Sequence, residues 1–362
     1  MAVWAEDRRG PEGRWFGWFG GSLWQSEPVV DPEIPQPPAN AVPEPPGRLY
    51  RAEDLFGGWE PDRPASAGET FDFVEYARAR VQGLRMPADR EVAAARARHD
   101  TAVSWELYEA LTGRRVVAIM GGHSMARNHP GYRLVAELAH ALSSKDFLLL
   151  SGGGPGAMEA THLGARCAGS KLELSEALTM MGADTPPAAP GEAPDDRLVF
   201  PFHSADELFD ADGGTIAEEV ARLHAWQAPA FAVAEASADD AGESIGVPTW
   251  MYGHEPPTPL ATMQAKYFDN SIREDGLLAL ATAGVVFAPG RAGTLQEIFQ
   301  DAAQNAYRTV ANRFSPMVFL DLDEYWTVHF GVRQVLERLF DDAEERHLHW
   351  VDTVADAVAA LG

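Results

Sequence analysis

Residues 147–159 read FLLLSGGGPGAME, an apolar run that passes directly into a glycine turn and the start of a helix. Residues 284–297, GVVFAPGRAGTLQE, repeat this arrangement. A glycine turn that opens a helix presents free backbone N–H groups and the positive end of the helix dipole to one point, which suits a phosphate group. We therefore predict two strand–turn–helix units that hold one nucleotide between them, with Glu297 as the carboxylate of the second turn.

Short apolar runs alternate with helical periods from residue 114 onwards. The strands that we predict span 115–120, 146–151, 230–235, 247–252, 284–288, 316–321 and 347–351. The predicted helices span 131–143, 155–168, 215–227, 260–281, 294–307, 323–340 and 353–361. Short apolar strands separated by helices are typical of a parallel sheet covered on both faces. The predicted fold class is therefore α/β, a Rossmann-like doubly wound parallel sheet that binds ligands at the carboxyl ends of its strands.

The composition divides the chain into three parts. Residues 1–48 are rich in proline and tryptophan and predict an irregular arm that lies on the main domain or on a partner subunit. Residues 49–112 predict a helical extension with helices at 70–83 and 87–112. Residues 113–362 form the predicted nucleotide-binding domain. Within this domain, the Pro-, Gly- and acid-rich residues at about 170–212 predict an inserted surface excursion.

The charge and cysteine content limit the partners and the compartment. The formal net charge of −25 argues against a general nucleic-acid or anionic-membrane binder, because such proteins need basic patches. Cys167 is the only cysteine, which excludes an internal disulfide or a multi-cysteine zinc site and indicates a reducing, cytoplasmic setting. No run approaches the roughly 18 apolar residues of a membrane span, and the first residues show no secretion signal.

Both turns also have plain structural interpretations. The first fits the dinucleotide fingerprint only weakly, and Pro155 suits the first position of a helix in any case. In the second, Thr294 and Glu297 have the spacing of a capping box, in which the glutamate side chain reaches back to the helix start. Only the preceding strand and Pro-Gly turn favour a functional role for Glu297.

The order of three motifs resembles a known family. These motifs are MGGHS at 120–124, GGGPGAM at 152–158 and PGxxGTxxE at 289–297. Together they resemble the LOG ("Lonely guy") family of nucleotide phosphoribohydrolases, which also carries the label "possible lysine decarboxylase". The first turn is similar to that of the larger bacterial nucleotide 5′-monophosphate nucleosidases. The resemblance covers roughly residues 113–361, with a gap at the insertion.

The resemblance implies hydrolysis of a nucleoside 5′-monophosphate to free base and ribose 5-phosphate, in a homodimer and with neither a metal nor another cofactor. It places the catalytic glutamate at Glu297 and the arginine of the preceding helix at Arg273, with Lys266 as the alternative. The residues that we expect to bind phosphate or nucleotide are Gly153, Gly154, Gly156, Met158, Gly290, Arg291, Gly293 and Thr294. Further candidate substrate contacts are Gly122, Ser124, Glu159 and Glu255.

Three positions depart from the family pattern. Arg291 replaces a glycine, Gln296 replaces the first glutamate of the second motif, and Glu274 replaces the lysine of the usual Arg-Lys pair. These departures leave open the alternative of a nucleotide-binding protein that does not catalyse. A further alternative is a carrier of a pterin-type cofactor, which resembles this superfamily in fold.

Overall fold

The computed structural model describes residues 18–19, 22–23, 41–187, 195–310, 312 and 314–362. Most of the arm that we predict for residues 1–48 lies outside this part of the chain, as does a short piece of the insertion. Within the described part, no helix combines the length and apolarity needed to cross a membrane.

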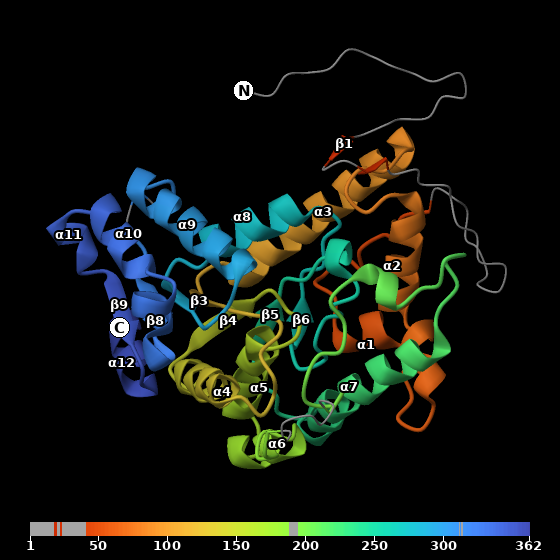
Figure 1. The fold of residues 1–362 in the computed structure, drawn as a ribbon, viewed down its shortest axis with the longest axis horizontal. Helices are drawn as coiled ribbons and strands as arrows, with labels where there is room; N and C mark the ends of the chain where they lie inside the picture. The colour runs from red at the N-terminus through yellow and green to blue at the C-terminus, as the bar shows by residue number, and fades with distance from the viewer. Residues whose placement is uncertain (1–17, 20–21, 24–40, 188–194, 311, 313) are drawn as a thin grey trace.

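An all-parallel sheet of seven strands forms the centre of the molecule (Figure 1). The spatial order is β6-β5-β4-β3-β7-β8-β9, so the chain winds outward in both directions from the β3–β7 pair. In chain order the strands are β3 (Arg115–Met120), β4 (Phe147–Ser151), β5 (Ser244–Gly246), β6 (Met263–Gln264), β7 (Gly284–Phe287), β8 (Met317–Leu320) and β9 (Leu348–Val351). A crevice forms outside the carboxyl ends of the strands where the winding reverses. Two short strands, β1 (Trp18–Phe19) and β2 (Ser22–Leu23), pair separately.

Helices cover both faces of the sheet (Figure 1). They are α1 (Ala52–Phe56), α2 (Phe71–Gln82), α3 (Arg90–Leu111), α4 (Pro130–Ser143), α5 (Ala157–Gly169), α6 (Leu174–Met180), α7 (Ala217–Ala236), α8 (Asn270–Leu280), α9 (Ala292–Tyr307), α10 (Val332–Leu339), α11 (Asp342–Glu345) and α12 (Val354–Leu361). Because successive side chains of a strand point to opposite faces, β3 divides its residues between two cores. Val116, Ala118 and Met120 belong to the core with α3, α8 and α9. Val117 and Ile119 belong to the core with α4, α5 and α12. The predicted fold class is confirmed.

Five of the seven predicted strands lie within one residue of their observed limits, and the other two are corrected. Residues 230–235 are not a strand but the end of α7, an alanine-rich helix that continues past Pro229. The strand predicted at 247–252 lies earlier, at β5, and residues 250–252 form the 3₁₀ turn η3 (Trp250–Tyr252). The helix predicted at 260–281 begins only at Asn270, because β6 occupies its start.

The segment predicted as a surface excursion contributes to the core. Leu198, Phe200 and Phe202 are buried, and the ring of Phe200 packs edge-on against that of Trp226 in α7 at 4.9 Å between centroids. The proline and acidic content of this segment concealed its aromatic anchors. The helical extension likewise shares the core of the sheet through α1, α2 and α3.

Candidate functional site

The two glycine turns meet at the end of β3. The Gly122 N–H donates to Pro289 O at 3.1 Å, and the Ala157 N–H donates to Gly122 O at 3.2 Å. A Cβ on Gly122 would lie 3.3 Å from Gly290 Cα. Gly122 therefore stands between the turn after β4 and the turn after β7, which converge because these strands flank β3.

The first turn is held by a buried chain of polar groups. Gly153 and Gly156 have φ values of 76° and 70°, which favour glycine. The Gly153 N–H donates to Ser151 Oγ at 3.1 Å, and this oxygen lies 2.8 Å from His162 Nε2. Burial lowers the pKa of His162 to about 3, so the imidazole is neutral at pH 7. The Gly153 amide is thus engaged within the protein.

Other amides of the first turn remain available to a ligand. Among the described residues, the Gly154 and Gly156 N–H groups have no hydrogen-bond partner. The Met158 side chain lies against this turn, with its Cε 3.1 Å from the position of a Cβ on Gly154. An anion at the start of α5 would therefore be bound by Gly154, Gly156 and the first turn of the helix.

The second turn opens α9 without side-chain capping. The first backbone bond of the helix runs from the Leu295 N–H to Arg291 O at 2.9 Å, so the preceding amides, including those of Gly293 and Thr294, have no partner within the helix. No side chain caps this end of α9. The capping-box interpretation is therefore wrong, because the helix begins two residues before Thr294. No atom lies within 4 Å of a Cβ on Gly293, which leaves room for a ligand.

Arg273 joins the first turn to Glu297. Its Nε donates to Val247 O at 2.8 Å, and its Nη2 lies against Gly152. Glu297 is partly buried on α9, and this burial raises its pKa to about 7, with Arg273 lowering the pKa and Glu274 raising it. Arg273 and Glu297, the two residues predicted to be catalytic, are therefore within electrostatic reach of each other, and burial raises the pKa of the carboxyl group to about 7.

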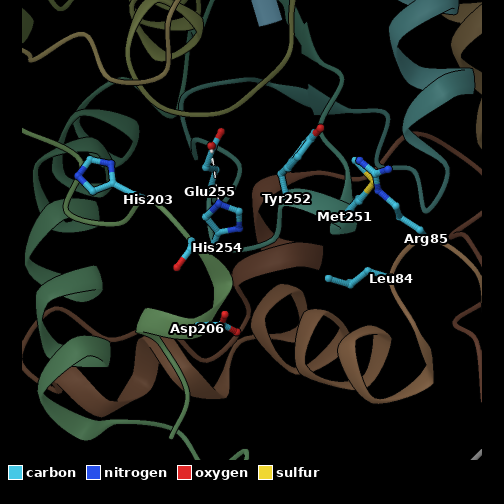
Figure 2. Close-up of a pocket in the computed structure, with 9 residues that line it drawn as sticks. Leu84, Arg85, His203, Asp206, Met251, Tyr252, His254 and Glu255 are labelled. Carbon is cyan, nitrogen blue, oxygen red and sulfur yellow. Dashed lines mark ion pairs between the residues drawn. The ribbon is translucent and has the colours of Figure 1, made fainter. Parts of the chain in front are cut away.

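Glu255 is a second carboxyl group at this edge. Its Oε1 lies 3.4 Å from His123 Nδ1, on the loop after β3. Burial raises the pKa of Glu255, while the charges of His123 and Arg273 oppose the increase. Arg273 therefore acts on both Glu255, on the loop after η3 (Trp250–Tyr252; Figure 2), and Glu297, on α9, which come from opposite sides of β3.

Two of the departures from the family pattern contact each other. Gln296 Nε2 on α9 donates to Glu274 Oε2 on α8 at 2.8 Å. Glu274 Oε1 in turn lies 3.8 Å from Arg273 Nη1. The two departing residues thus form a polar contact between α8 and α9.

Some predicted residues lie elsewhere. Glu159 is 1% exposed and forms a buried bidentate ion pair with Arg127 at 2.7 and 2.8 Å, so it offers no free oxygen to a substrate. Lys266 is fully buried and pairs with Asp72. Ser124, in contrast, is exposed on the loop after β3 and directly follows His123 at the same edge of the sheet.

One residue of the site had no sequence signal. The Tyr325 hydroxyl donates to Gly290 O at 2.7 Å and thereby holds the second turn. Tyr325 follows β8 and belongs to no motif, so its role appears only in three dimensions. In the described part of the chain, no group of three or more His, Cys, Asp or Glu side chains is arranged to hold a metal ion.

Together the fold and the site define a Rossmann-like protein with paired glycine turns, an arginine and a carboxyl group at the carboxyl edge of the sheet. Residues 231–361 match the family model described as "Possible lysine decarboxylase". Over these residues the chain is similar to this family, which is the LOG family of the motif resemblance.

Three of the solved structures that resemble the chain match it over almost their whole length. The X-ray structure of TM1055, a structural-genomics target, shows 20% identity and a TM-score of 0.37 over 67% of this chain and 96% of that chain. The molybdenum cofactor carrier protein from Chlamydomonas reinhardtii shows 16% identity and a TM-score of 0.36 over 68% and 96%. The molybdenum cofactor binding protein from the phototrophic bacterium Rippkaea orientalis shows 11% identity and a TM-score of 0.32 over 68% and 95%. No curated protein matches the chain.

Proposed function

We propose that the protein hydrolyses the N-glycosidic bond of a nucleoside 5′-monophosphate and releases the free base and ribose 5-phosphate. The proposal depends on one observation above all: the two glycine turns converge on Gly122, with Arg273 fixed against the first turn and Glu297 on the helix that the second turn opens. A phosphate bound by the two turns would place its ribose beside this carboxyl group.

The phosphate is bound by backbone amides. Gly154 and Gly156 of the first turn and Gly293 and Thr294 of the second converge from the two sides of Gly122. Arg291 is exposed at the second turn and adds a charge-assisted contact at the rim. The amides and helix dipoles let an acidic protein bind an anion without a basic patch.

The chemical step uses the carboxyl group of Glu297. With a pKa of about 7, a substantial fraction is ionised at neutral pH. The carboxylate stabilises positive charge on the ribose and accepts a proton from the attacking water. The C1′–N bond breaks, its electron pair leaves with the base, and the base takes up a proton. One water molecule therefore supplies the hydroxyl group on C1′ and, in net balance, the proton on the base, while Arg273 orients the substrate.

The proposal is tested by incubating the purified protein with a panel of nucleoside monophosphates and measuring free base and ribose 5-phosphate. We expect release from at least one nucleotide, and we expect Glu297→Gln to lower kcat by about 10²- to 10⁴-fold, as for loss of a general base. Release no greater than that of the Glu297→Gln variant for every nucleotide would refute hydrolysis.

The replacements at 274, 291 and 296 favour a second candidate, a nucleotide-binding protein without turnover. Glu274 and Gln296 satisfy each other, and Arg291 stands where the family has a glycine beside the ligand. Calorimetry distinguishes the candidates, because a pure binder shows tight nucleotide binding that Glu297→Gln leaves unchanged. A coloured or fluorescent ligand that co-purifies with the protein would indicate the pterin-type carrier instead.

A further inference from the structure

The segment that follows β8 has an unusual backbone. The consecutive residues Asp323 and Glu324 have φ values of 52° and 57°, in the left-handed region where a side chain is unfavourable. A π-helical turn, η5 (Tyr325–His329), follows them directly. Left-handed residues other than glycine and π-helical turns are both rare, and both concentrate at functional sites, where the surrounding contacts hold them in place.

Hydrogen bonds attach this segment to its own first residue and to the neighbouring strands. The Asp321 carboxylate accepts the Trp326 N–H at 2.6 Å, the Thr327 N–H at 3.1 Å and the Thr327 hydroxyl at 2.6 Å. The buried Trp326 side chain donates its indole N–H to Phe287 O, at the end of β7, at 3.0 Å. The Asp321 N–H donates to Val351 O, at the end of β9, at 2.7 Å. Because β7 and β9 flank β8, the segment is held from both sides.

This backbone directs Tyr325 toward the second glycine turn. The Tyr325 hydroxyl donates to Gly290 O at 2.7 Å. The carbonyl one residue earlier, Pro289 O, accepts the Gly122 N–H at 3.1 Å. In the described part of the chain, the N–H groups of Gly290 and Arg291 have no hydrogen-bond partner. The protein thus holds the carbonyl groups of this turn and leaves its N–H groups available to a ligand.

The hydroxyl group acts on the peptide that joins Gly290 to Arg291. The Gly290 carbonyl and the Arg291 N–H lie in one plane and point in opposite directions, so a donor on the carbonyl fixes the direction of the N–H. A hydrogen bond to the carbonyl also polarises the peptide and makes its N–H a stronger donor. Burial raises the pKa of Tyr325, and the charge of Arg291 opposes the increase. The hydroxyl group therefore stays protonated at neutral pH and remains a donor.

We infer that Tyr325 is a positioning residue, whose hydroxyl sets the Gly290–Arg291 peptide in the orientation that binds the phosphate group of the ligand. The inference rests on the proposed function, because it takes the phosphate to lie on the two glycine turns. It does not depend on the chemical step, since a binding protein without turnover would hold the phosphate in the same way. The strained residues 323–324 are the means by which the chain brings Tyr325 to this turn.

The test removes the hydroxyl and keeps the ring, with Tyr325→Phe. Calorimetry with ribose 5-phosphate measures affinity without any turnover, and steady-state kinetics give KM and kcat for each nucleoside monophosphate that is hydrolysed. We expect Tyr325→Phe to weaken ribose 5-phosphate binding by about 5- to 10-fold, as for loss of one hydrogen bond. KM should rise by a similar factor, with kcat changed by less than about twofold. A merely structural role would lower the active fraction, and so kcat, without raising KM.

A matched control makes the same chemical change elsewhere on the protein. Tyr307 lies at the end of α9 and is 81% exposed, so Tyr307→Phe removes a hydroxyl that faces solvent. We expect this variant to bind ribose 5-phosphate with the wild-type affinity. Thermal unfolding of each variant shows that the protein is folded at the assay temperature.

Two substitutions at Glu324 test the strained backbone, because this side chain is exposed. Glu324→Gly suits the left-handed conformation, so it should raise the melting temperature and keep the affinity for ribose 5-phosphate. Glu324→Val places a β-branched residue in a conformation that such residues avoid, so it should weaken binding as Tyr325→Phe does. Wild-type affinity in Glu324→Val would overturn the role of the strained residues.

The outcomes separate this inference from the proposed function. Unchanged affinity and KM in Tyr325→Phe overturn the inference while hydrolysis stands, and so does a fall in kcat alone. Ribose 5-phosphate binding that Tyr325→Phe weakens supports the inference even if no nucleotide is hydrolysed, in which case the hydrolase is overturned by itself. A wild-type protein that binds no ribose 5-phosphate overturns both the positioning role and the phosphate site on the turns.

Discussion

The guanidinium of Arg273 lies directly against Gly152, so that a methyl group on the glycine would overlap Nη2 of the arginine. The same methyl group would lie 2.6 Å from Met158 Sδ. Gly152 has no positive φ, in contrast to Gly153 and Gly156. The first glycine of the turn therefore leaves room for the side chain of Arg273 in this position, and Gly153 and Gly156 suit the positive φ of the backbone.

Gly152→Ala is accordingly expected to displace Arg273 and to lower kcat/KM for nucleotide hydrolysis by roughly 10- to 100-fold, since small displacements of a positioning group cost rates of this order. Gly276→Ala provides the control, because Gly276 is on the same helix as Arg273 and no atom lies within 4 Å of its Cβ position. Steady-state kinetics give kcat/KM for both variants and for the wild type. Equal activity of the two would show that contact between Arg273 and the turn is dispensable.

Glu297 is expected to give the reaction a pH dependence near neutrality. Its pKa is raised to about 7, with Arg273 and Glu274 as the charged groups that act on it. If the carboxylate is the active form, kcat/KM rises with pH through about 7 and levels off above it. A pH–rate profile from pH 5 to 9 checks this. A profile that is flat across this range would separate Glu297 from the chemical step.

The same pKa predicts a stability effect of definite sign. The unfolded carboxyl group titrates near 4.5 and the folded one near 7, so the unfolded state loses its proton first as the pH rises. The contribution of the Glu297 carboxyl group to the free energy of unfolding is fully present below pH 4.5, where the group is protonated in both states. This contribution is lost as the pH rises from 4.5 to 7. Glu297→Gln should therefore be more stable than the wild type at pH 8, by about 1–3 kcal/mol. Urea unfolding at pH 4.5 and 8 measures the free energy of unfolding of both proteins. A stability gain in Glu297→Gln of equal size at the two pH values would contradict the titration of Glu297.

The sheet and the two turns could be predicted from sequence because their signals are local. An apolar run followed by glycines and a helical period identifies β4 and β7 and places Glu297 after the second turn. The strand at 230–235 was predicted wrongly for the same reason, since Phe231 and Val233 form an apolar run inside an alanine-rich helix. Short runs of this kind do not distinguish a strand from a buried helical turn.

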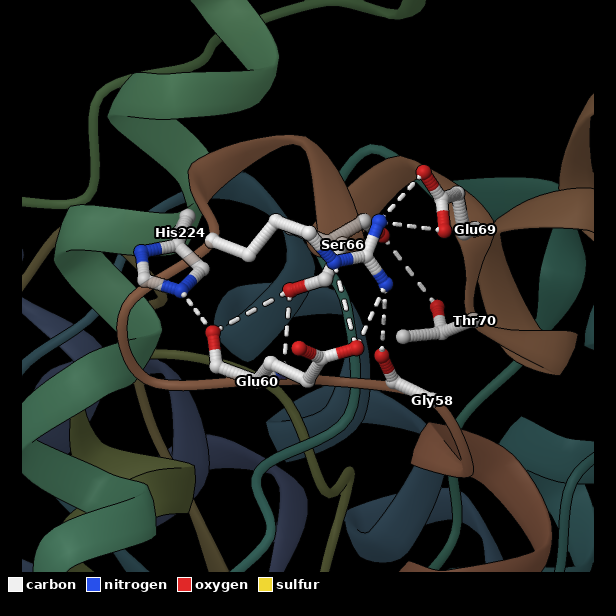
Figure 3. Close-up of polar contacts among 8 residues, drawn as sticks. Gly58, Glu60, Ser66, Glu69, Thr70 and His224 are labelled. Atoms are coloured by element: carbon white, nitrogen blue, oxygen red, sulfur yellow. Dashed lines mark hydrogen bonds and ion pairs between the residues drawn. The ribbon is translucent and has the colours of Figure 1, made fainter.

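The remaining contacts of the site could not be predicted, because they join segments that are far apart in the chain. Neither the pairing of His123 with Glu255 nor that of Glu274 with Gln296 has a fixed spacing. The contacts of the helical extension could not be predicted either, for the same reason. In Figure 3, Glu60 O of the extension accepts a hydrogen bond of 2.8 Å from His224 Nε2 on α7, across more than 160 positions.

The buried pair of Arg127 and Glu159 is expected to be structural. Both side chains are 1% exposed, and the Tyr132 hydroxyl also donates to the carboxylate at 3.0 Å. Glu159→Ala leaves the arginine buried without its partner and should destabilise the protein by about 3–5 kcal/mol. Chemical denaturation measures this loss. Glu53→Ala, which removes an exposed contact of 3.9 Å to Arg51, should cost less than about 1 kcal/mol. A similar small loss for Glu159→Ala would contradict the structural role.

Asp301 is expected to make the protein less stable at alkaline pH. Its side chain on α9 is 2% exposed, and its Oδ2 has no hydrogen-bond partner in the described part of the chain. Burial raises its pKa from 3.8 to about 8, so stability from this group is present below pH 4 and is lost as the pH rises to 8. Between pH 5 and 9, we expect the free energy of unfolding to fall by about 2–5 kcal/mol less in Asp301→Asn than in the wild type. Parallel denaturation curves for the two proteins would contradict this titration.

Asp100 connects the helical extension to Arg273. Its carboxylate on α3 accepts the N–H groups of Phe268 at 3.0 Å and Asp269 at 2.8 Å, at the start of α8, and it lies 2.9 Å from His99 Nδ1. Arg273 follows one turn later on the same helix, so the extension fixes the orientation of the site arginine.

Asp100→Ala should therefore lower kcat/KM by about tenfold through displacement of α8, as expected for a misplaced positioning group. It should also cost about 2–4 kcal/mol of stability, because the buried Phe268 N–H and the partly buried Asp269 N–H lose their acceptor. Glu109→Ala on the exposed side of α3 is the control. Kinetics are measured well below the unfolding temperature of each variant. The pH–rate profile gives an independent readout, because a displaced Arg273 lowers the pKa of Glu297 less and shifts the rising limb to higher pH. Loss of stability with an unchanged profile and unchanged kcat/KM would limit Asp100 to a purely structural role.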